Sequence, residues 1–279
     1  MVEYLQAQLG VEDADSHHGE AESRVALVEP DQCGGWPDTV HVVEGSITRP
    51  LECVRAFDGV EAVFLAGAHP STVQDALTLA RNAPARRVVL LSSHGPEHEE
   101  ANPPETWFWL AIEKAVEHSG IAWTHIRPSA VMGAVVEGTY PATGSDWPDT
   151  IRADGVVREA FLDQGHYPFI HEQDLAAVVA AALISDDYTG TLVEAVGPPL
   201  STRSRIQSIA TALGRDIGMV DLAADESRAM WRRRGWPDGA IDAPPAAVRA
   251  GHHRPPTAHL PLHCSRSLTH DVAPNRKSQ

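Results

Sequence analysis

Short apolar runs alternate with longer amphipathic stretches over the first half of the chain. Runs rich in Val, Ile and Leu predict β-strands at residues 24–28, 40–43, 62–66, 87–91 and 122–126. Apolar residues at three-to-four spacing predict helices at residues 50–57, 71–82 and 104–119. Strands that alternate with helices are typical of βαβ units around a parallel sheet. The pattern therefore predicts an α/β fold with a doubly wound parallel sheet.

The second half of the chain is less regular. The sequence between Val135 and Ile151 is rich in turn residues, and we expect a long loop there that acts as a lid. A helix at 172–184 and a strand at 191–196 are predicted to follow, and then a helix that begins after Ser201. This order predicts a smaller C-terminal lobe that binds the substrate.

Capping signals mark the ends of two of the predicted helices. Ser71 is a candidate N-cap, because its hydroxyl can accept a hydrogen bond from a backbone N–H of the first turn. Gly120 is a candidate stop, because glycine adopts the left-handed conformation that follows many helices.

The predicted elements group into three parts. Residues 1–135 form the core with the parallel sheet, and residues 136–245 form the substrate lobe and lid, with a crossover back to the core. Residues 246–279 are basic and rich in Pro and His, and we expect this tail to be loosely held.

Composition and charge exclude several classes of function. The chain has 279 residues, of which 43% are hydrophobic, and this is enough to form a sizeable core. Its net charge of −16 opposes binding to nucleic acid and to anionic membranes. No apolar run approaches the roughly 20 residues that span a bilayer, and the N-terminus lacks the order of a signal peptide. We therefore expect a cytoplasmic protein that binds neither nucleic acid nor membrane.

Three stretches together resemble the NmrA-like branch of the atypical short-chain dehydrogenase/reductase superfamily. They are VVEGSITRPLECVRAFDGVEAVFLAG, RRVVLLSSHG with AIEKAVEHSGIAWTHIRPSAVMG, and YPFIHEQDLAAVVAAAL with YTGTLVEAVGPPLSTRSRIQSIATALGR. They follow one another in the order of the family and span roughly residues 23 to 235. The resemblance implies a Rossmann-like fold, a nicotinamide cofactor, a small-molecule substrate and, by family habit alone, a homodimer.

One part of the family pattern has no counterpart. Relatives open with a strand and a Gly-x-x-Gly-x-x-Gly turn, whose backbone approaches the pyrophosphate of the dinucleotide. Here residues 1–10 (MVEYLQAQLG) match the helix that should follow that turn. Either the chain starts late relative to its relatives, or the protein has given up tight dinucleotide binding. We favour weakened or lost binding.

Glu29 bears on the choice between NAD and NADP. Relatives that prefer NADP carry an Arg after the second strand of the family, where it pairs with the 2′-phosphate. Because the family's first strand has no counterpart here, the predicted strand at 24–28 takes the place of the second, and Glu29 follows it. A carboxylate repels that phosphate and accepts hydrogen bonds from ribose hydroxyls, so we expect a preference for NAD. The alternative is a solvated glutamate in an acidic region.

The resemblance places ligands at the carboxyl ends of the strands. It implies cofactor contacts at Gly67, Ser92, Pro128 and Met132. Ser93 and the neighbouring His94 are catalytic candidates, because a hydroxyl can donate to a substrate oxygen and an imidazole can relay a proton near neutral pH. The alternative is that the serines cap the strand end and that His94 is solvated.

Glu113 and Lys114 are further catalytic candidates. Glu113 occupies the glutamate position of the family, where it acts as a base or holds an arginine. Lys114 is the sole lysine before Lys277, but Leu110 stands four residues before it, so the usual Tyr-x-x-x-Lys dyad is absent. This absence argues against ordinary alcohol chemistry and leaves direct hydride transfer open.

Aromatic residues suggest a flat substrate. Trp107 and Trp109 flank Phe108 at the start of a predicted helix, where the three cannot share one face. With Trp147 in the expected lid, they are candidate substrate contacts. His171 resembles a motif at the hinge between the two lobes of the family, and it borders the pocket or is structural.

A metal site is not expected. Although His259 and His263 have the i, i+4 spacing of ligands on a helix, Pro255, Pro256 and Pro261 interrupt any helix there.

Three functions are consistent with these residues. The first is an NAD(P)-dependent oxidoreductase with weakened cofactor binding, which tailors an aromatic or quinone-like compound in bacterial secondary metabolism. The second is a non-catalytic regulator or accessory protein, and the third is a non-redox isomerase or coupling factor that uses the same cleft. The first is our working prediction.

Overall fold

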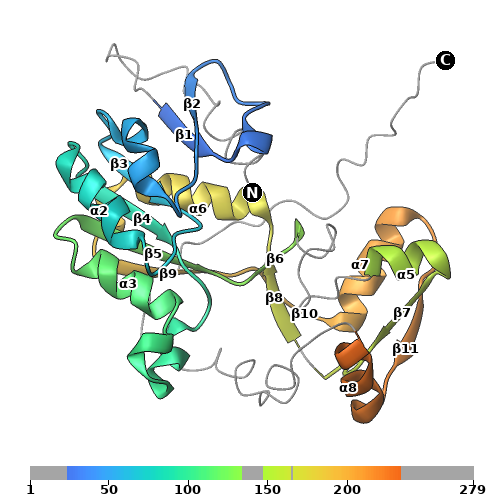
Figure 1. Ribbon diagram of the computed structural model, residues 1–279. Helices are drawn as coiled ribbons and strands as arrows, with labels where there is room; N and C mark the ends of the chain where they lie inside the picture. The colour runs from blue at the N-terminus through green and yellow to red at the C-terminus, as the bar shows by residue number, and fades with distance from the viewer. Residues whose placement is uncertain (1–23, 134–146, 165, 234–279) are drawn as a thin grey trace, which may run out of the picture. The chain divides into compact units, whose positions relative to one another are not determined.

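The structure is a computed structural model of the chain, and it describes residues 24–133, 147–164 and 166–233 (Figure 1). The contacts divide these residues into two compact units. The first unit holds the described residues of 24–129 and 170–197, and the second holds those of 130–169 and 198–233. The predicted tail at 246–279 lies outside the described residues.

The first unit is built on parallel strands. One sheet has the order β3-β4-β5-β9, and all its neighbours run parallel. A separate parallel pair is formed by β1 and β2. The bounds are β1 Arg24–Val28, β2 Val40–Glu44, β3 Ala62–Leu65, β4 Arg87–Leu91, β5 Ala122–Pro128 and β9 Thr191–Ala195. Each agrees with its predicted strand to within two residues, and the α/β class is confirmed.

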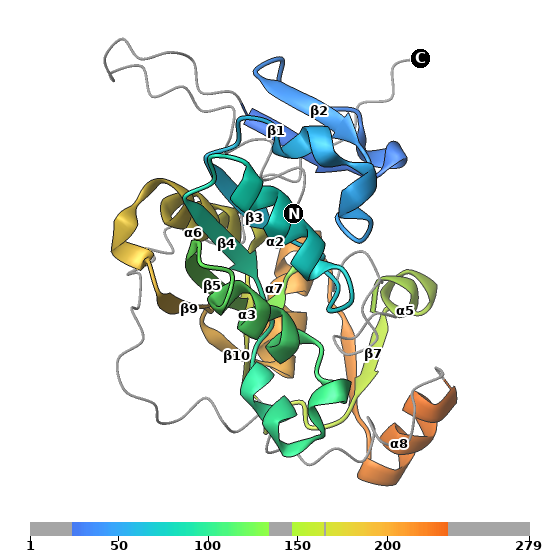
Figure 2. The same cartoon turned by 60° about the vertical axis from the view of Figure 1, so that its left-hand side comes forward.

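Helices cover both faces of the four-stranded sheet. Figures 1 and 2 show α2 (Val73–Asn82) and α3 (Trp109–Glu117) on one face, and α6 (Glu172–Ile184) on the other. Parallel strands covered on both faces are apolar throughout, and β4 is an example, because Val88, Val89 and Leu90 are all buried. The apolar face of α2 packs on the same core as Val88 and Leu90.

The parallel strands of the first unit form two separate sheets, with a break between β1 and β3. The chain passes from β1 outward to β2 and then returns to build β3, β4 and β5 in turn. Val25 and Leu27 of β1 pack against the core that contains Leu65 of β3, but no backbone ladder joins the two sheets within the described residues. In doubly wound folds the strand order reverses at a switch point, where ligands bind. The split therefore lies at the switch point of this fold.

Two of the predicted helices differ from the structure. Residues 50–57 form two short 3₁₀ segments, because Cys53 leaves the helical conformation and its backbone N–H bonds to Pro50 O. Residues 104–106 are also 3₁₀, and α3 begins only at Trp109. The remaining 3₁₀ segments are η1 Pro30–Gln32, η4 Pro96–Ala101 and η7 Asp186–Tyr188.

The capping predictions have mixed outcomes. Ser71 is not the N-cap of α2, since Thr72 holds that position and the Ser71 hydroxyl lies 2.8 Å from His69 Nδ1. Gly120 follows α3 with a φ of 79°, as predicted. Ser201 caps the following helix by accepting a hydrogen bond from the Ser204 backbone N–H.

The second unit is smaller and mixed. Its strands pair in the order β10-β8-β6 and, separately, as a parallel pair of β11 and β7. Its elements are β6 Ala130–Val131, α5 Trp147–Ala153, β7 Val156–Glu159, β8 His166–Ile170, β10 Pro199–Ser201, α7 Thr202–Leu213, β11 Gly218–Asp221 and α8 Ala224–Arg233. Of the expected lid loop between Val135 and Ile151, residues 135–146 lie outside the described residues, and the part from Trp147 onward is wrong, because it is helical in α5. Among the described residues, no helix combines the length and the apolar character needed to span a membrane.

Candidate functional site

Polar and small residues follow the strands of the first unit at their carboxyl ends. Glu29 follows β1 and is exposed, and Gly67 lies just after β3 with a φ of 74°. A Cβ at Gly67 would meet only Ile47, at 3.7 Å, so the backbone there is open to a ligand. Ser92 directly follows β4, and Pro128 is the last residue of β5. Four of the predicted cofactor contacts thus occupy strand ends of one unit, whereas Met132 belongs to the second unit.

Gly45 holds the end of β2 close to the rest of the fold. A Cβ on Gly45 would lie 2.2 Å from Cys53 Sγ, which no real contact allows. Ser46 comes next, and it is buried with its hydroxyl 2.9 Å from Thr48 Oγ1. The close approach of backbone and Cys53 therefore requires glycine at this strand end.

A buried polar network joins the ends of β4 and β5 to α3. Arg127 donates from Nε to Glu113 Oε1 at 2.8 Å and from Nη2 to Glu113 Oε2 at 2.6 Å. The Ser92 hydroxyl donates to Glu113 Oε1 at 2.6 Å, and Arg127 Nη1 donates to Glu97 Oε2 at 2.6 Å. Glu113 is 1% exposed and Arg127 6%. The geometry supports the alternative in which Glu113 holds an arginine.

Arg127 stays charged in this network. Burial by itself would lower the pKa of Arg127, but the hydrogen bonds and the charge of Glu113 outweigh burial, so the pKa is raised. Bidentate arginine–carboxylate pairs are strong and directional. The network therefore anchors the strand ends, and both carboxylate oxygens of Glu113 are occupied by hydrogen bonds instead of being available to act as a base.

Ser93 and His94 extend beyond the network. Ser93 is half-buried and His94 is exposed, and Gly95 turns the chain after them with a φ of 76°. No hydrogen bond to either side chain is found among the described residues, in contrast to Ser92. Both side chains can therefore meet a ligand without breaking an existing bond.

Sequence reasoning missed the role of Glu99. Its carboxylate accepts hydrogen bonds from the backbone N–H groups of Phe108, Trp109 and Leu110, at 2.8, 3.2 and 3.0 Å. These are the unpaired donors at the start of α3, which a carboxylate satisfies and the helix dipole favours. Glu99 lies nine to eleven residues before its partners, so no local capping motif in the sequence predicts this role.

The aromatic run is not arranged as predicted. Only Trp109 lies in α3, and its ring packs against the core of the first unit. Trp107 precedes the helix and donates from Nε1 to Asn102 O at 3.0 Å. Phe108 contacts both Trp109 and His69 edge to face. The argument from helical faces is therefore wrong, because the three residues do not share a helix.

Two more candidates are held in structural contacts. The Lys114 ammonium is 2.9 Å from Glu117 Oε2, on the exposed side of α3. Trp147 is 2% exposed and lies in the core of the second unit with Ile151 and Leu162, not in a lid. Burial of the indole explains this tryptophan without a ligand.

His171 begins α6. Its Nδ1 accepts a hydrogen bond from the Gln173 backbone N–H at 3.1 Å, so the ring caps the helix and its Nε2 carries the proton in the neutral form. Asp174 lies in the first turn, where the helix dipole favours a carboxylate. His171 keeps about a third of its side chain exposed.

His125 is a buried histidine that sequence reasoning did not single out. Its ring stacks on Trp123 with centroids 4.3 Å apart, and its Nε2 lies 3.5 Å from Glu117 Oε1. Burial lowers the pKa of His125, and the charges of Glu113 and Glu117 offset this only in part. His125 is therefore neutral in the folded protein at pH 7.

The lowered pKa of His125 makes stability fall in acid. Below about pH 6.5 the unfolded chain binds a proton at this side chain and the folded chain resists it, so stability drops by up to about 1.4 kcal/mol per pH unit. We expect urea unfolding between pH 7.5 and 5 to show a shallower decline for His125→Phe, whose ring keeps the stack on Trp123. The exposed His41→Gln variant is the control and should decline as the wild type does. Equal slopes for His125→Phe and the wild type would contradict this assignment.

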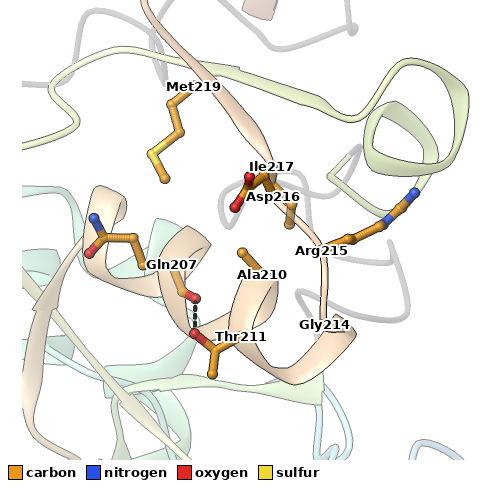
Figure 3. A pocket seen from close by; sticks show the side chains of 8 residues that line it. All are labelled: Gln207, Ala210, Thr211, Gly214, Arg215, Asp216, Ile217 and Met219. Atoms are coloured by element: carbon orange, nitrogen blue, oxygen red, sulfur yellow. Dashed lines mark hydrogen bonds between the residues drawn. The ribbon is translucent and has the colours of Figure 1, made fainter.

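A hollow of about 580 Å³ lies in the second unit, between the end of α7 and the start of β11 (Figure 3). Thr211 Oγ1 donates to Gln207 O at 2.9 Å within it, and Arg215 points away from its centre. It holds none of the predicted site residues. Its lining is Gln207, Ala210, Thr211, Gly214, Arg215, Asp216, Ile217 and Met219.

A family model described as NAD(P)H-binding matches residues 14–186, more than half of the chain. The chain belongs to this NAD(P)H-binding family.

One relative of this chain is a reductase. The chain is 31% identical over 192 residues to the (4-alkanoyl-5-oxo-2,5-dihydrofuran-3-yl)methyl phosphate reductase of Streptomyces griseus subsp. griseus. The match covers 68% of this chain and 64% of that protein, so the chain spans less than two thirds of the relative.

Solved structures show the same fold. The triphenylmethane reductase of Citrobacter sp., complexed with NADP(H), has a TM-score of 0.63 at 17% identity and covers 90% of this chain and 85% of that one. The NADPH-dependent quinone oxidoreductase of Escherichia coli, complexed with NADPH, has a TM-score of 0.61 at 19% identity and covers 86% and 81%. The Rossmann-like fold predicted for this NAD(P)H-binding protein is thereby confirmed.

The described residues fit a dinucleotide in part. Strand ends with an exposed carboxylate at Glu29 and an open backbone at Gly67 suit a ribose and a phosphate. A glycine-rich turn at the switch point has no counterpart in the part of the chain that the structure describes. No group of three or more metal-ligating side chains occurs there either, and His259 and His263 lie outside it.

Proposed function

We propose that this protein is an NmrA-like, NAD(P)-dependent reductase of a small aromatic or quinone-like compound in bacterial secondary metabolism. The observation that carries the proposal is the placement of Ser93 and His94, which follow β4 directly after the anchored Ser92. Family membership and the reductase names of the relatives support it. We further propose that the protein acts in the cytoplasm.

Two residues would act on the substrate. When bound, a reduced nicotinamide would supply the hydride that reduces the acceptor. The Ser93 hydroxyl donates a hydrogen bond to the acceptor oxygen, and the exposed His94 imidazole provides the proton that this oxygen takes up. The Ser92–Glu113–Arg127 network keeps the strand ends in place, so that both groups are positioned in advance.

The remaining candidates divide by their contacts. Glu29, Gly67 and Pro128 would hold the cofactor, together with the backbone of Ser92. Trp107 and His171 keep accessible surface and are retained as substrate contacts. A second set is left out because its contacts are structural or belong to the other unit: Glu113, Lys114, Trp109, Trp147 and Met132.

We propose that the cofactor binds weakly and that NAD is preferred. The split between β1 and β3 supports weak binding, because the switch point is where a dinucleotide-binding turn normally leaves the sheet. The exposed Glu29 supports NAD, since its carboxylate would face the 2′-phosphate of NADP with like charge.

Cofactor titration tests this proposal. Following tryptophan quenching, we expect saturable NADH binding in the micromolar range or weaker, with NADPH weaker still. Glu29→Arg should reverse the preference by about tenfold or more, because it replaces repulsion by a charge-assisted bond. Asp31→Arg, with the same charge change two residues on, is the matched control and should leave the preference unchanged. Nanomolar binding of either cofactor would contradict weak binding. A shift in cofactor preference for Asp31→Arg as large as that for Glu29→Arg would contradict the role of Glu29.

Turnover tests the reductase itself. We would follow the absorbance of NADH with a panel of quinones that includes menadione. Loss of the reduced nicotinamide that depends on both quinone and protein is the expected result. Saturable NADH binding without turnover of any quinone in the panel would overturn the proposal and favour the non-catalytic alternative.

A further inference from the structure

His69 lies beyond the carboxyl end of β3, in the segment that leads into α2. It comes four residues after Leu65, the last residue of β3, and Leu65 pairs with Leu90 in the ladder between β3 and β4. His94 comes four residues after Leu90. Two neighbouring parallel strands of the first unit are therefore each followed, at the same offset, by an exposed histidine.

The ring of His69 is held in one orientation. Its Nδ1 accepts a hydrogen bond from the Ser71 backbone N–H at 3.2 Å and lies 2.8 Å from Ser71 Oγ. The ring also packs edge to face on Phe108, with centroids 5.4 Å apart. The Phe108 backbone N–H is in turn bound by Glu99, so the segment that follows β4 meets the segment that follows β3 at this pair of rings.

These contacts determine which ring nitrogen of His69 is a donor. Because Nδ1 accepts from a backbone N–H, the neutral ring carries its proton on Nε2. No hydrogen bond to Nε2 is found among the described residues, and His69 is exposed. The Nε2–H is therefore a donor of fixed orientation that is open to a ligand.

The start of α2 does not need this imidazole. The carbonyl of His69, and not its ring, accepts hydrogen bonds from the backbone N–H groups of Thr72 and Val73, at 3.0 and 2.9 Å. Any residue at this position can supply that carbonyl. A ring that is oriented from two sides, at the strand ends where doubly wound sheets bind their ligands, is typical of a contact that is preorganised for binding.

We propose that His69 selects acceptors with a second oxygen, such as 1,4-quinones, by donating a hydrogen bond from Nε2 to that oxygen. The inference rests on the proposed function, in which Ser93 and His94 act on the first oxygen. Neighbouring strands lie about 4.8 Å apart, so donors that follow β3 and β4 suit two oxygens of one ring. Negative charge develops on the oxygens of a quinone as it is reduced, and a donor fixed in advance stabilises that charge.

Two substitutions separate the donor from the ring. His69→Phe keeps an aromatic ring beside Phe108 and removes the donor, so it should lower kcat/KM for menadione about tenfold to 100-fold, the range for a hydrogen bond to a charged group. His69→Gln keeps an N–H donor and should recover part of this loss. His41→Gln changes an exposed histidine of β2 in the same unit, and this matched control should keep the wild-type rate. Thermal unfolding should change little in all three variants.

Binding without the cofactor keeps the inference distinct from the proposed function. Menadione carries two ring oxygens and 1-tetralone carries one, and the binding of each is followed by tryptophan quenching without NADH. His69→Phe should weaken menadione binding about tenfold and leave 1-tetralone binding unchanged, whereas the loss of a merely structural residue would weaken both.

Three results would overturn the inference: no loss of menadione binding in His69→Phe, an equal loss for both ligands, or no saturable binding of menadione by the wild type. If menadione binds through His69 but no quinone is reduced, the proposed reductase fails and the inference stands.

Discussion

Arg127→Met is expected to destabilise the first unit by about 3–5 kcal/mol. The substitution leaves the carboxylate of Glu113, which is 1% exposed, without its bidentate partner. A buried charge that loses its counterion costs far more than an exposed pair contributes, because water cannot replace the missing partner. The Ser92 hydroxyl alone cannot compensate.

Thermal unfolding measures this loss. The midpoint should fall by about 6–20 °C, given about 2–4 °C for each kcal/mol in a chain of this size. Arg86→Met is the matched control, because it breaks the exposed pair with Glu61 and should cost less than about 1 kcal/mol. Adding Glu113→Gln to Arg127→Met should recover part of the loss by removing the buried charge. If Arg127→Met were as stable as Arg86→Met, the network would not anchor the strand ends.

The double variant Ser93→Ala, His94→Ala is expected to lower kcat/KM for menadione by about 100-fold to 10,000-fold. The proposed mechanism needs a donor to the acceptor oxygen and a proton source, and such groups contribute this much to proton transfer. Neither side chain is bonded to another described residue, so their loss should change stability little. Cofactor binding should therefore persist while turnover is lost.

The control for this variant uses a second adjacent pair of serine and histidine. His118 and Ser119 follow α3 on the segment that leads into the start of β5, away from the carboxyl ends of the strands. Unlike Ser93 and His94 they make hydrogen bonds, His118 with Lys114 O and Ser119 with the Ile121 backbone N–H, so thermal unfolding is measured beside turnover. Turnover with NADH and menadione is measured for both double variants, with thermal unfolding as a check on folding. If turnover falls equally in both, or in neither, Ser93 and His94 are not the catalytic residues.

The sequence predicted elements well where local signals and packing agree. The helix at 172–184 was predicted with its observed bounds, because its apolar residues and the breaking residues around it point to the same ends. The hydroxyl of Ser201 caps α7 as predicted. The strands were found because parallel strands buried on both faces are apolar along their whole length.

Prediction failed where the local pattern and the tertiary contacts disagree. Residues 50–57 have helical spacing but form two short 3₁₀ turns. At the junction of these turns, Cys53 Sγ donates hydrogen bonds to the carbonyls of Ser46 and Arg49. Trp147 follows a turn-rich segment and was placed in a lid, whereas its indole is a core residue of the second unit. Burial of a large ring outweighs the character of the neighbouring sequence.

The candidate site shows the same division. Ser92, Ser93 and His94 could be placed from the sequence, because residues that follow an apolar strand lie at its carboxyl end. The role of Glu113 stayed open, since its partner Arg127 is on another element and helical spacing does not reveal it. Glu99 and His125 went unnoticed, because their roles depend on contacts with distant residues and on burial.

The sequence by itself determined the α/β class and the order of the strands along the chain, because these follow from local periodicity. Only the tertiary structure decided that β1 and β2 form a sheet apart from β3 and that Glu113 is bound to Arg127. Hydrogen-bond partners, burial and backbone strain depend on which distant segments meet, and one-dimensional spacing carries little information about that.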